Sequence, residues 1–121
     1  SWIVEGSFQA HSGHEHMTAL LSKFPEITAV ACANDETAYG ACNAIREKGL
    51  SIPEDVSVIG FDDVEFSEFT YPRLSTIHYP TREIGELAAN WVLGKVYNQQ
   101  DYSDPSIICP HVVERDSIKQ R

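Results

Sequence analysis

The sequence predicts an α/β fold organised around a parallel β-sheet, and three observations lead to this prediction. Short apolar, strand-like runs recur along the first half of the chain, at Trp2–Val4, Ile27–Ala33 and Val56–Phe61. The turns that follow them, at Phe8, Asn34 and Asp62, are spaced like βαβ units of about 30 residues. Amphipathic helical patterns follow the first two turns. Because βαβ units connect neighbouring strands by right-handed crossovers, we expect the strands to be parallel.

The composition favours a globular protein and argues against several function classes. The chain has 121 residues, of which 42% are apolar, and this is enough to form a core. Its 9 Lys and Arg against 18 Asp and Glu give a net charge of -9, which would repel a phosphate backbone or anionic lipid. No apolar stretch approaches the roughly 20 residues that span a bilayer. We therefore expect no direct contact of this segment with nucleic acid or membrane.

The cysteines give an expectation about redox state and cellular location, and the first residue gives one about the length of the polypeptide. Cys32, Cys42 and Cys109 are far apart and form no CxxC pair, so neither a disulfide framework nor a zinc site is predicted. Reduced thiols and a cytoplasmic location are the expectation. The chain begins at Ser1, directly before a strand-like run, and we expect it to be a piece of a longer polypeptide.

The helices and strands of the first half have separate signals. Apolar residues recur at helical spacing at Met17, Leu20, Leu21 and Phe24, and Pro25 ends this helix. The run Ile27–Ala33 is continuously apolar, as in a strand covered on both faces. Asp35 is expected to be the N-cap of the next helix. The apolar face of that helix is formed by Ala38, Ala41, Cys42 and Ile45.

The second half has a different pattern. Pro72 and Pro80 bracket an extended segment, and a helix is predicted over Arg82–Val96 with Thr81 as its N-cap. Its buried stripe is expected at Ile84, Leu87, Ala88, Trp91 and Val92. A polar loop over residues 98–106 precedes the apolar run Ile107–Val113, whose Pro110 favours an edge strand. Residues 114–121 are polar and expected to be exposed.

A candidate binding site follows from the predicted sheet. Phe8, Asn34 and Asp62 each follow a strand-like run, and the carboxyl ends of parallel strands open onto one crevice. An aromatic ring can pack on the C–H face of a sugar, while the amide and the carboxylate bind its hydroxyls. Residue type alone also allows Phe8 to be an ordinary core residue. Asp63 is expected to be a structural cap for the segment after it.

The segment "ACANDETAYGACNAIREKGLSIPEDVSVIGFDDVEFSEFTYPRLSTIHYP" resembles the sensor region of the LacI/GalR family of bacterial transcription regulators. The shared pattern is an apolar strand ending in Asn-Asp, a turn with Pro and Asp-Val-Ser, a strand ending in Gly-Phe-Asp-Asp, and Pro-x-Leu-[Ser/Thr]-Thr. Upstream "VEGSFQAHSG" and downstream "VVERDS" are also similar to family motifs. The resemblance thus covers nearly the whole chain. Within the family, the sequence "VIGFDDVEFSEF" is most similar to galactose-type repressors.

The resemblance implies a periplasmic-binding-protein-like sensor domain of two α/β lobes, incomplete in this chain, with the effector between the lobes. Residues 1–77 would form most of the C-terminal lobe, 78–113 a crossover with a helix and a strand of the N-terminal lobe, and 114–121 a C-terminal tail. Phe8, Asn34 and Asp62 would bind the effector, a sugar. No cofactor and no catalytic residue is implied.

The resemblance also implies the partners. The protein would be a cytoplasmic homodimer that binds operator DNA through a helix-turn-helix absent from this sequence, and effector binding would change operator affinity allosterically. The subunit contact would include Tyr39, Phe66, Phe69 and Tyr71. The alternative for these aromatics is that some belong to the core.

Two other functions are compatible with parts of the sequence. A secreted sugar-binding protein of a transporter would share the fold, and the residues before Ser1 would distinguish it. A metal-dependent hydrolase is raised by His11, His14 and His16 beside a carboxylate-rich edge. These histidines offer at most two ligands on one helix face, so exposed surface histidines are the preferred interpretation.

Overall fold

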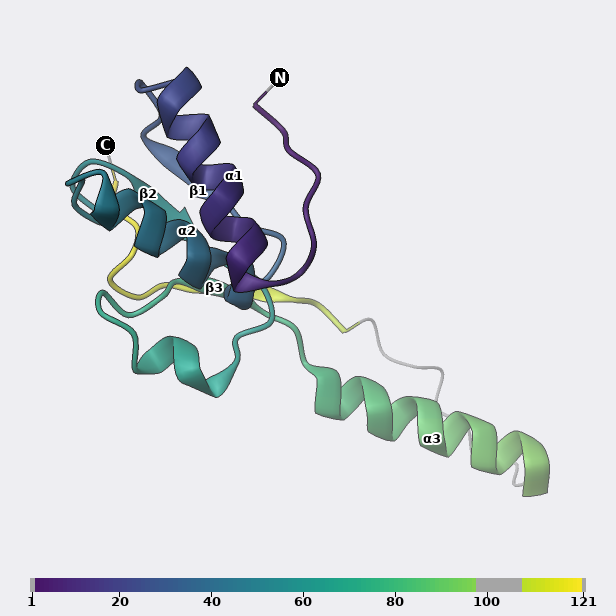
Figure 1. The fold of residues 1–121 in the computed structure, drawn as a ribbon. Helices are drawn as coiled ribbons and strands as arrows, with labels where there is room; N and C mark the ends of the chain where they lie inside the picture. Colours follow the sequence, from purple (N-terminus) through teal and green to yellow (C-terminus); the bar gives the residue numbers. More distant parts are fainter. Residues whose placement is uncertain (1, 98–107, 121) are drawn as a thin grey trace. The chain divides into compact units, whose positions relative to one another are not determined.

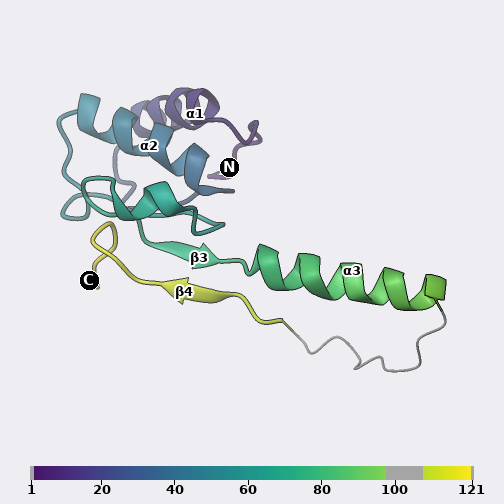
Figure 2. The same ribbon diagram turned by 90° about the horizontal axis from the view of Figure 1, so that it is seen from below.

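The computed structural model describes residues 2–97 and 108–120, and these divide into two compact units (Figures 1 and 2). Unit 1 comprises Ser1–His78 and Val112–Arg121, and unit 2 comprises Tyr79–His111. Unit 1 contains helices α1 and α2 and the strands β1 and β2, and it confirms the α/β class. The predicted loop over 98–106 and the residue Ile107 lie outside the described residues.

Two helices of unit 1, α1 (Ala10–Lys23) and α2 (Asp35–Glu47), lie side by side in Figures 1 and 2. A Cβ on Gly13 would lie 2.1 Å from the carbonyl oxygen of Thr37, and one on Gly40 would lie 1.8 Å from that of Ala10. These two glycines therefore allow the helix backbones to approach closely. Both predicted helix faces are confirmed, since they supply these buried core residues: Met17, Leu21, Ala38, Ala41, Cys42 and Ile45.

The parallel sheet prediction is also confirmed. β1 (Ala29–Ala31) pairs in parallel with β2 (Ser57–Ile59), with Val30 opposite Val58. Two further expectations are wrong. Ala29 and Ala31 are exposed, so β1 is not covered on both faces. The run Trp2–Val4 is not a β-strand: the Trp2 ring instead contacts that of Phe24, the residue after α1, with the two centroids 5.8 Å apart.

The strand β3 (Thr76–His78) forms a second two-stranded sheet with β4 (His111–Val113), and parallel bridges at Ile59–Ser75 and Asp62–His78 join it to the end of β2. A short 3-10 helix, η1 (Glu65–Glu68), lies between β2 and β3. This arrangement brings β3 alongside the two aspartates that follow β2.

The C-terminal tail differs from the exposed segment that its polarity predicts. Ser117 is fully buried: its hydroxyl donates to the carbonyl of Val58 at 2.6 Å and accepts from the amide of Ser75 at 2.8 Å. The amide of Val58 in turn donates to the carbonyl of Ser117 at 2.8 Å. A polar side chain is buried here because β2 and the residues before β3 offer backbone groups for it to satisfy.

Unit 2 contains the helix α3 (Thr81–Tyr97), which matches the predicted range to within one residue at each end. Thr81 lies inside the helix rather than at its N-cap. The predicted buried stripe is largely wrong, because Trp91 and Val92 are each 52% exposed. A lone helix cannot bury its own apolar face, and α3 is the one helix among the described residues of unit 2. In the described part of the chain, no helix is long and apolar enough to cross a membrane.

Candidate functional site

Two of the three residues predicted to bind a ligand, Phe8 and Asn34, are in contact in the structure. The Asn34 amide group donates from Nδ2 to the carbonyl oxygen of Phe8 at 3.1 Å. Its Oδ1 accepts from the amide of Thr37 at 2.9 Å, so Asn34 is the N-cap of α2. The Phe8 side chain is 68% exposed, which excludes its alternative role as a core residue. The Asn34 side chain at the start of α2 is therefore next to the backbone of the exposed Phe8.

The third predicted ligand residue, Asp62, lies at the same edge. The amide of Asp35 donates to the carbonyl of Phe61 at 2.8 Å, which fixes the residues after β1 beside those after β2. The amide of Asp62 donates to the carbonyl of Ile77 at 3.0 Å, and its φ is 110°. Within the described residues its carboxylate accepts no hydrogen bond. Partial burial, and then the charge of Asp35, raise the pKa of Asp62. Its carboxylate oxygens are thus available to a hydroxyl or amine donor.

Asp63 does not cap the segment after it, contrary to the prediction. The residue before η1 is Val64, and no side chain caps that helix. The Asp63 carboxylate accepts instead from Nη2 of Arg115 at 2.7 Å and from Nδ1 of His78 at 2.9 Å. Burial acts to raise the pKa of Asp63, but the hydrogen bonds from Arg115 and His78 outweigh it and the pKa is lowered. Asp63 therefore links the residues after β2 to the C-terminal tail through Arg115 and to β3 through His78.

Arg115 is a residue that sequence reasoning missed. Its side chain is only 9% exposed, and besides Asp63 it donates from Nη1 to the carbonyl of Leu74 at 2.8 Å. The motif "VVERDS" contains it, but a charged residue in a polar tail resembles any solvated one. Its role depends on a contact between residues far apart in the chain, which no local pattern encodes.

Asp35 was expected to be an N-cap, and this is wrong because Asn34 has that role. The Asp35 side chain is fully buried behind the strand ends. Its Oδ2 accepts from the amide of Val64 at 3.0 Å and from the hydroxyl of Ser67 at 2.7 Å, and its Oδ1 accepts from the hydroxyl of Thr76 at 2.5 Å. Three donors compensate the cost of burying this carboxylate, which would otherwise be large.

The aromatic residues expected at a subunit contact gather around η1. Phe66, Phe69 and Tyr71 are 62%, 72% and 91% exposed, while Tyr39 is partly buried. The rings of Tyr39 and Phe66 meet edge to face, with centroids 5.4 Å apart. Three of the four side chains therefore lie outside the core and form an exposed aromatic surface. We refer to Tyr39, Phe66, Phe69 and Tyr71 as the aromatic surface.

The histidines of α1 have separate partners rather than one shared site. Nε2 of His11 lies 3.3 Å from Glu15, Nε2 of His14 lies 2.8 Å from Glu47, and Nδ1 of His16 lies 3.1 Å from the hydroxyl of Ser12. Across residues 2–97 and 108–120, no group of three or more His, Cys, Asp or Glu is arranged to hold a metal ion. The three histidines thus give no support to the hydrolase alternative.

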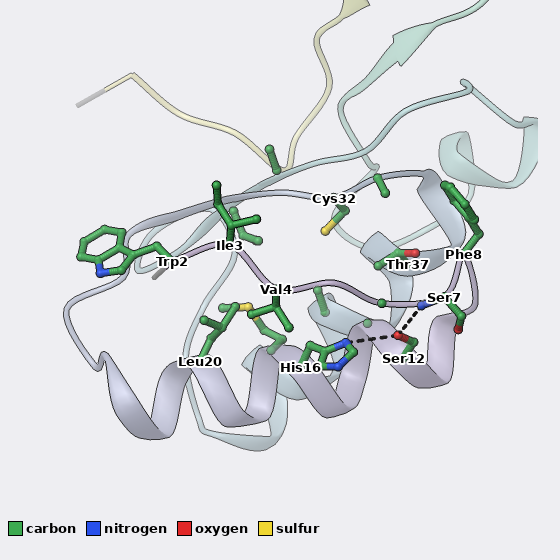
Figure 3. A pocket seen from close by; sticks show the side chains of 17 residues that line it. Trp2, Ile3, Val4, Ser7, Phe8, Ser12, His16, Leu20, Cys32 and Thr37 are labelled. Atoms are coloured by element: carbon green, nitrogen blue, oxygen red, sulfur yellow. Dashed lines mark hydrogen bonds between the residues drawn. The ribbon is translucent and has the colours of Figure 1, made fainter.

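Figure 3 shows a cavity of about 240 Å³, whose lining does not include the predicted ligand residues Asn34 and Asp62. It lies between the N-terminal segment, α1 and β1, and its labelled lining includes Ile3, Val4, Leu20 and Cys32. Among its polar groups is Ser12, whose hydroxyl accepts from the amide of Ser7 at 3.0 Å. Phe8 lines one end of the cavity and is its one residue from the predicted trio.

Comparisons with known proteins agree with this architecture. Residues 3–118 match the family described as periplasmic binding protein-like domain. The chain is 42% identical over 118 residues to the HTH-type transcriptional repressor PurR of Salmonella arizonae, covering 98% of this chain and 35% of that protein. The PurR of Salmonella typhi matches equally well. The chain thus spans about a third of the length of the curated relatives it matches.

Solved structures of LacI-family regulators are also similar to this chain in fold and sequence. A LacI-family regulatory protein from Corynebacterium glutamicum has a TM-score of 0.89 at 33% identity, over 98% of this chain and 46% of that one. A sugar-binding LacI-family regulator from Escherichia coli, complexed with phosphate, has a TM-score of 0.87 at 33% identity, over 93% and 40%.

The fold defines a domain of the periplasmic-binding-protein-like class. More specifically, the chain belongs to the LacI/GalR family of transcription regulators, as part of its sensor domain. The relatives are transcriptional repressors, which agrees with the expectation of a regulator rather than an enzyme.

Proposed function

We propose that this chain is the C-terminal part of the effector-binding domain of a cytoplasmic repressor, in which a sugar binds against Phe8, Asn34 and Asp62. The observation that supports the proposal is that Asn34 and Asp62 follow the paired strands β1 and β2, and that Asn34 bonds the backbone carbonyl of the exposed Phe8. Among the described residues, the Asp62 carboxylate accepts no hydrogen bond. Ligands of such sheets bind outside the carboxyl ends of the strands.

The chemistry of the three residues supports a neutral polyhydroxylated ligand. Asp62 can accept from two hydroxyls, Asn34 retains one N–H beyond its bond to Phe8, and the Phe8 ring offers an apolar face. Anions are disfavoured because the Asp62 carboxylate, unlike that of Asp63, is paired with no cationic side chain among the described residues. Two similar solved structures, a LacI-family regulator complexed with lactose and the regulator CelR complexed with cellobiose, also support a sugar.

In the proposed repressor, residues 1–77 belong to the C-terminal lobe, 78–113 to the crossover and the N-terminal lobe, and 114–121 to the tail. Effector binding between the lobes changes their relative orientation, and with it the grip of a homodimer on operator DNA. The aromatic surface is the proposed subunit contact, since three of its rings are exposed. One neighbour is a lac repressor dimer bound to operator, which supports this assembly.

Calorimetry on the full-length repressor tests the effector site, with a panel of mono- and disaccharides as ligands. Asp62→Asn keeps the side-chain size and tolerates the positive φ, but it removes the charged acceptor. We expect affinity for the bound sugar to fall by roughly 1.5 to 3 kcal/mol. Glu26→Gln, which neutralises one exposed carboxylate elsewhere, is the matched control and should bind as the parent does.

The outcome also distinguishes ligand classes. A flat heteroaromatic base can stack on an exposed phenyl ring as a sugar can, so the panel includes a purine nucleobase. Binding of the base but of no sugar would reject the sugar and retain the site, provided that Asp62→Asn weakens it. Sugar binding that is unaffected by Asp62→Asn would reject the site itself.

Sedimentation velocity tests the proposed subunit contact. Phe66→Ser replaces a 62% exposed ring and should shift the full-length repressor from dimer to monomer. Trp2→Ser, which replaces a 63% exposed aromatic outside the aromatic surface, should leave the dimer intact. If the two variants sediment alike as dimers, the aromatic surface is not the subunit contact.

A further inference from the structure

The buried carboxylate of Asp35 is hydrogen-bonded to residues that lie next to both of the surfaces to which a function has been assigned. On one side are the residues after β2, which include Asp62. On the other side is η1, which presents Phe66 of the aromatic surface. All three donors to the Asp35 side chain, one backbone amide and two hydroxyls, come from the segment between β2 and β3 or from β3 itself, more than 25 residues further along the chain.

The first branch leads from Asp35 to the aromatic surface. The single hydroxyl proton of Ser67 is donated to Oδ2 of Asp35 at 2.7 Å. The hydroxyl of Tyr39 lies 2.7 Å from the same Ser67 oxygen, so Tyr39 must be the donor in that pair. The chain of hydrogen bonds therefore runs from Tyr39 through Ser67 to Asp35, and Ser67 is fully buried within it.

The second branch leads from Asp35 to the ligand edge. The hydroxyl proton of Thr76 is donated to Oδ1 of Asp35, and the same oxygen of Thr76 accepts from the amide of Asp63 at 3.3 Å. The amide of Val64 donates directly to Oδ2. Two successive backbone amides after Asp62 are thus held by Asp35, one directly and one through Thr76.

The backbone at this edge depends on such support. Asp62 and Asp63 have φ values of 110° and 57°, a conformation that residues other than glycine adopt only when their surroundings hold it. The Asp63 carboxylate is bonded to Arg115 and His78, and the Asp62 amide is bonded to Ile77. Asp35 supplies the remaining restraint, on the side of the segment that continues into η1.

We infer that Asp35 is a positioning residue that couples the ligand edge at Asp62 to the aromatic surface through Thr76 on one side and Ser67 on the other. The inference deepens the proposed function and rests on it for the meaning of the two surfaces. A fully satisfied buried hydrogen-bond network is rigid, so a displacement of one member strains the bonds of the next. A shift of the Asp62 backbone on effector binding would thus reach Tyr39 and Phe66.

Two conservative variants of the full-length repressor test the coupling in opposite directions. Ser67→Ala lies on the side of the aromatic surface, and its readout is amide hydrogen exchange at Asp63 and Val64. We expect exchange there to become about tenfold faster, because Asp35 loses one of its donors. Thr76→Val lies on the side of the ligand edge, and its readout is the dimer dissociation constant, which should rise by about tenfold.

Ser117→Ala is the matched control, because Ser117 is as deeply buried as Ser67 and also bonds the chain across long distances. It should lower stability without changing exchange at Asp63 and Val64 relative to the rest of unit 1. If Ser67→Ala leaves those amides unchanged, or if Ser117→Ala affects them equally, Asp35 does not couple the surfaces. The exchange measurement requires neither a ligand nor a dimer, so it decides the inference even if the proposed effector or subunit contact is wrong.

Discussion

Gly60 lies directly against the buried carboxylate of Asp35: a Cβ built on Gly60 would be 2.1 Å from Oδ1 of Asp35 and 3.1 Å from a methyl group of Leu74. This separation is far below van der Waals contact, so no side chain fits there without displacing Asp35. The carboxylate of Asp35 therefore restricts position 60, the first residue after β2, to glycine.

Gly60→Ala should therefore destabilise unit 1. We expect the free energy of unfolding to fall by about 1 to 3 kcal/mol, because Asp35 must move away from some of its three donors. Urea denaturation of the full-length protein, followed by circular dichroism, measures the change. Gly85→Ala in α3 is the control: nothing lies within 4 Å of its Cβ, and alanine should keep or raise stability. Equal midpoints for the two variants would contradict the close approach.

The contact of the tail with the sheet gives a second prediction. Ser117→Ala leaves the carbonyl of Val58 without its hydroxyl donor and the amide of Ser75 without its acceptor, both in a buried environment. We expect a loss of about 1 to 3 kcal/mol in unfolding free energy. Ser22→Ala removes an exposed hydroxyl that donates to the carbonyl of Thr18 at 2.8 Å and accepts from Nζ of the exposed Lys48 at 3.3 Å. Because these groups are in solvent, the change in stability should be small. A Ser117→Ala protein as stable as Ser22→Ala would show that the tail is not anchored.

The ion pairs of Asp63 predict a dependence of stability on pH. The folded-state pKa of Asp63 is lowered, so its contribution is complete above the unfolded value of about 3.9 and is lost as the pH falls through the folded-state pKa. Asp63→Asn should therefore cost roughly 1.5 to 3 kcal/mol at pH 7. The cost should disappear at pH values below the folded-state pKa, where the parent protein also carries a neutral side chain.

Denaturation at pH 7 and in strong acid measures this difference. Asp116→Asn is the matched control, because Asp116 also accepts from an arginine, Arg73 at 2.7 Å, but in solvent. An exposed pair of this kind contributes little to stability. A cost for Asp63→Asn that stays constant across the pH range would exclude the ion pairs as its cause.

The cysteines differ in predicted reactivity. Burial raises the pKa of Cys32 to about 12, with the charges of Cys42 and Asp35 adding to it, and burial raises that of Cys42 to about 11. Cys109 is exposed. Because the thiolate is the nucleophile, Cys109 should react with iodoacetamide at pH 8 and the other two should be protected in the folded protein.

Peptide mass spectrometry after a short pulse of iodoacetamide identifies the labelled residue. Cys109→Ser should abolish labelling of the native protein, and unfolding in urea should make Cys32 and Cys42 react as well. Labelling of Cys32 in the native protein at the rate of Cys109 would be incompatible with its raised pKa.

The sequence by itself determined the elements whose signals are local. The apolar spacing of Met17 and Leu21 predicts α1, and the alternation of apolar runs with polar turns predicts the parallel pairing of β1 with β2. These succeed because helix periodicity and strand length are properties of contiguous residues. Family motifs extended them to a regulator class that the comparisons confirm.

Burial and partner choice were decided only by the tertiary structure. Asp35 and Asp63 each follow a strand and look like helix caps, yet one is a fully buried acceptor of three hydrogen bonds and the other pairs with Arg115. Ser117 belongs to a polar tail and is fully buried. In each case the partner lies 29 to 59 residues away along the chain, and a local pattern reports a residue's own preference but not the distant group that satisfies it.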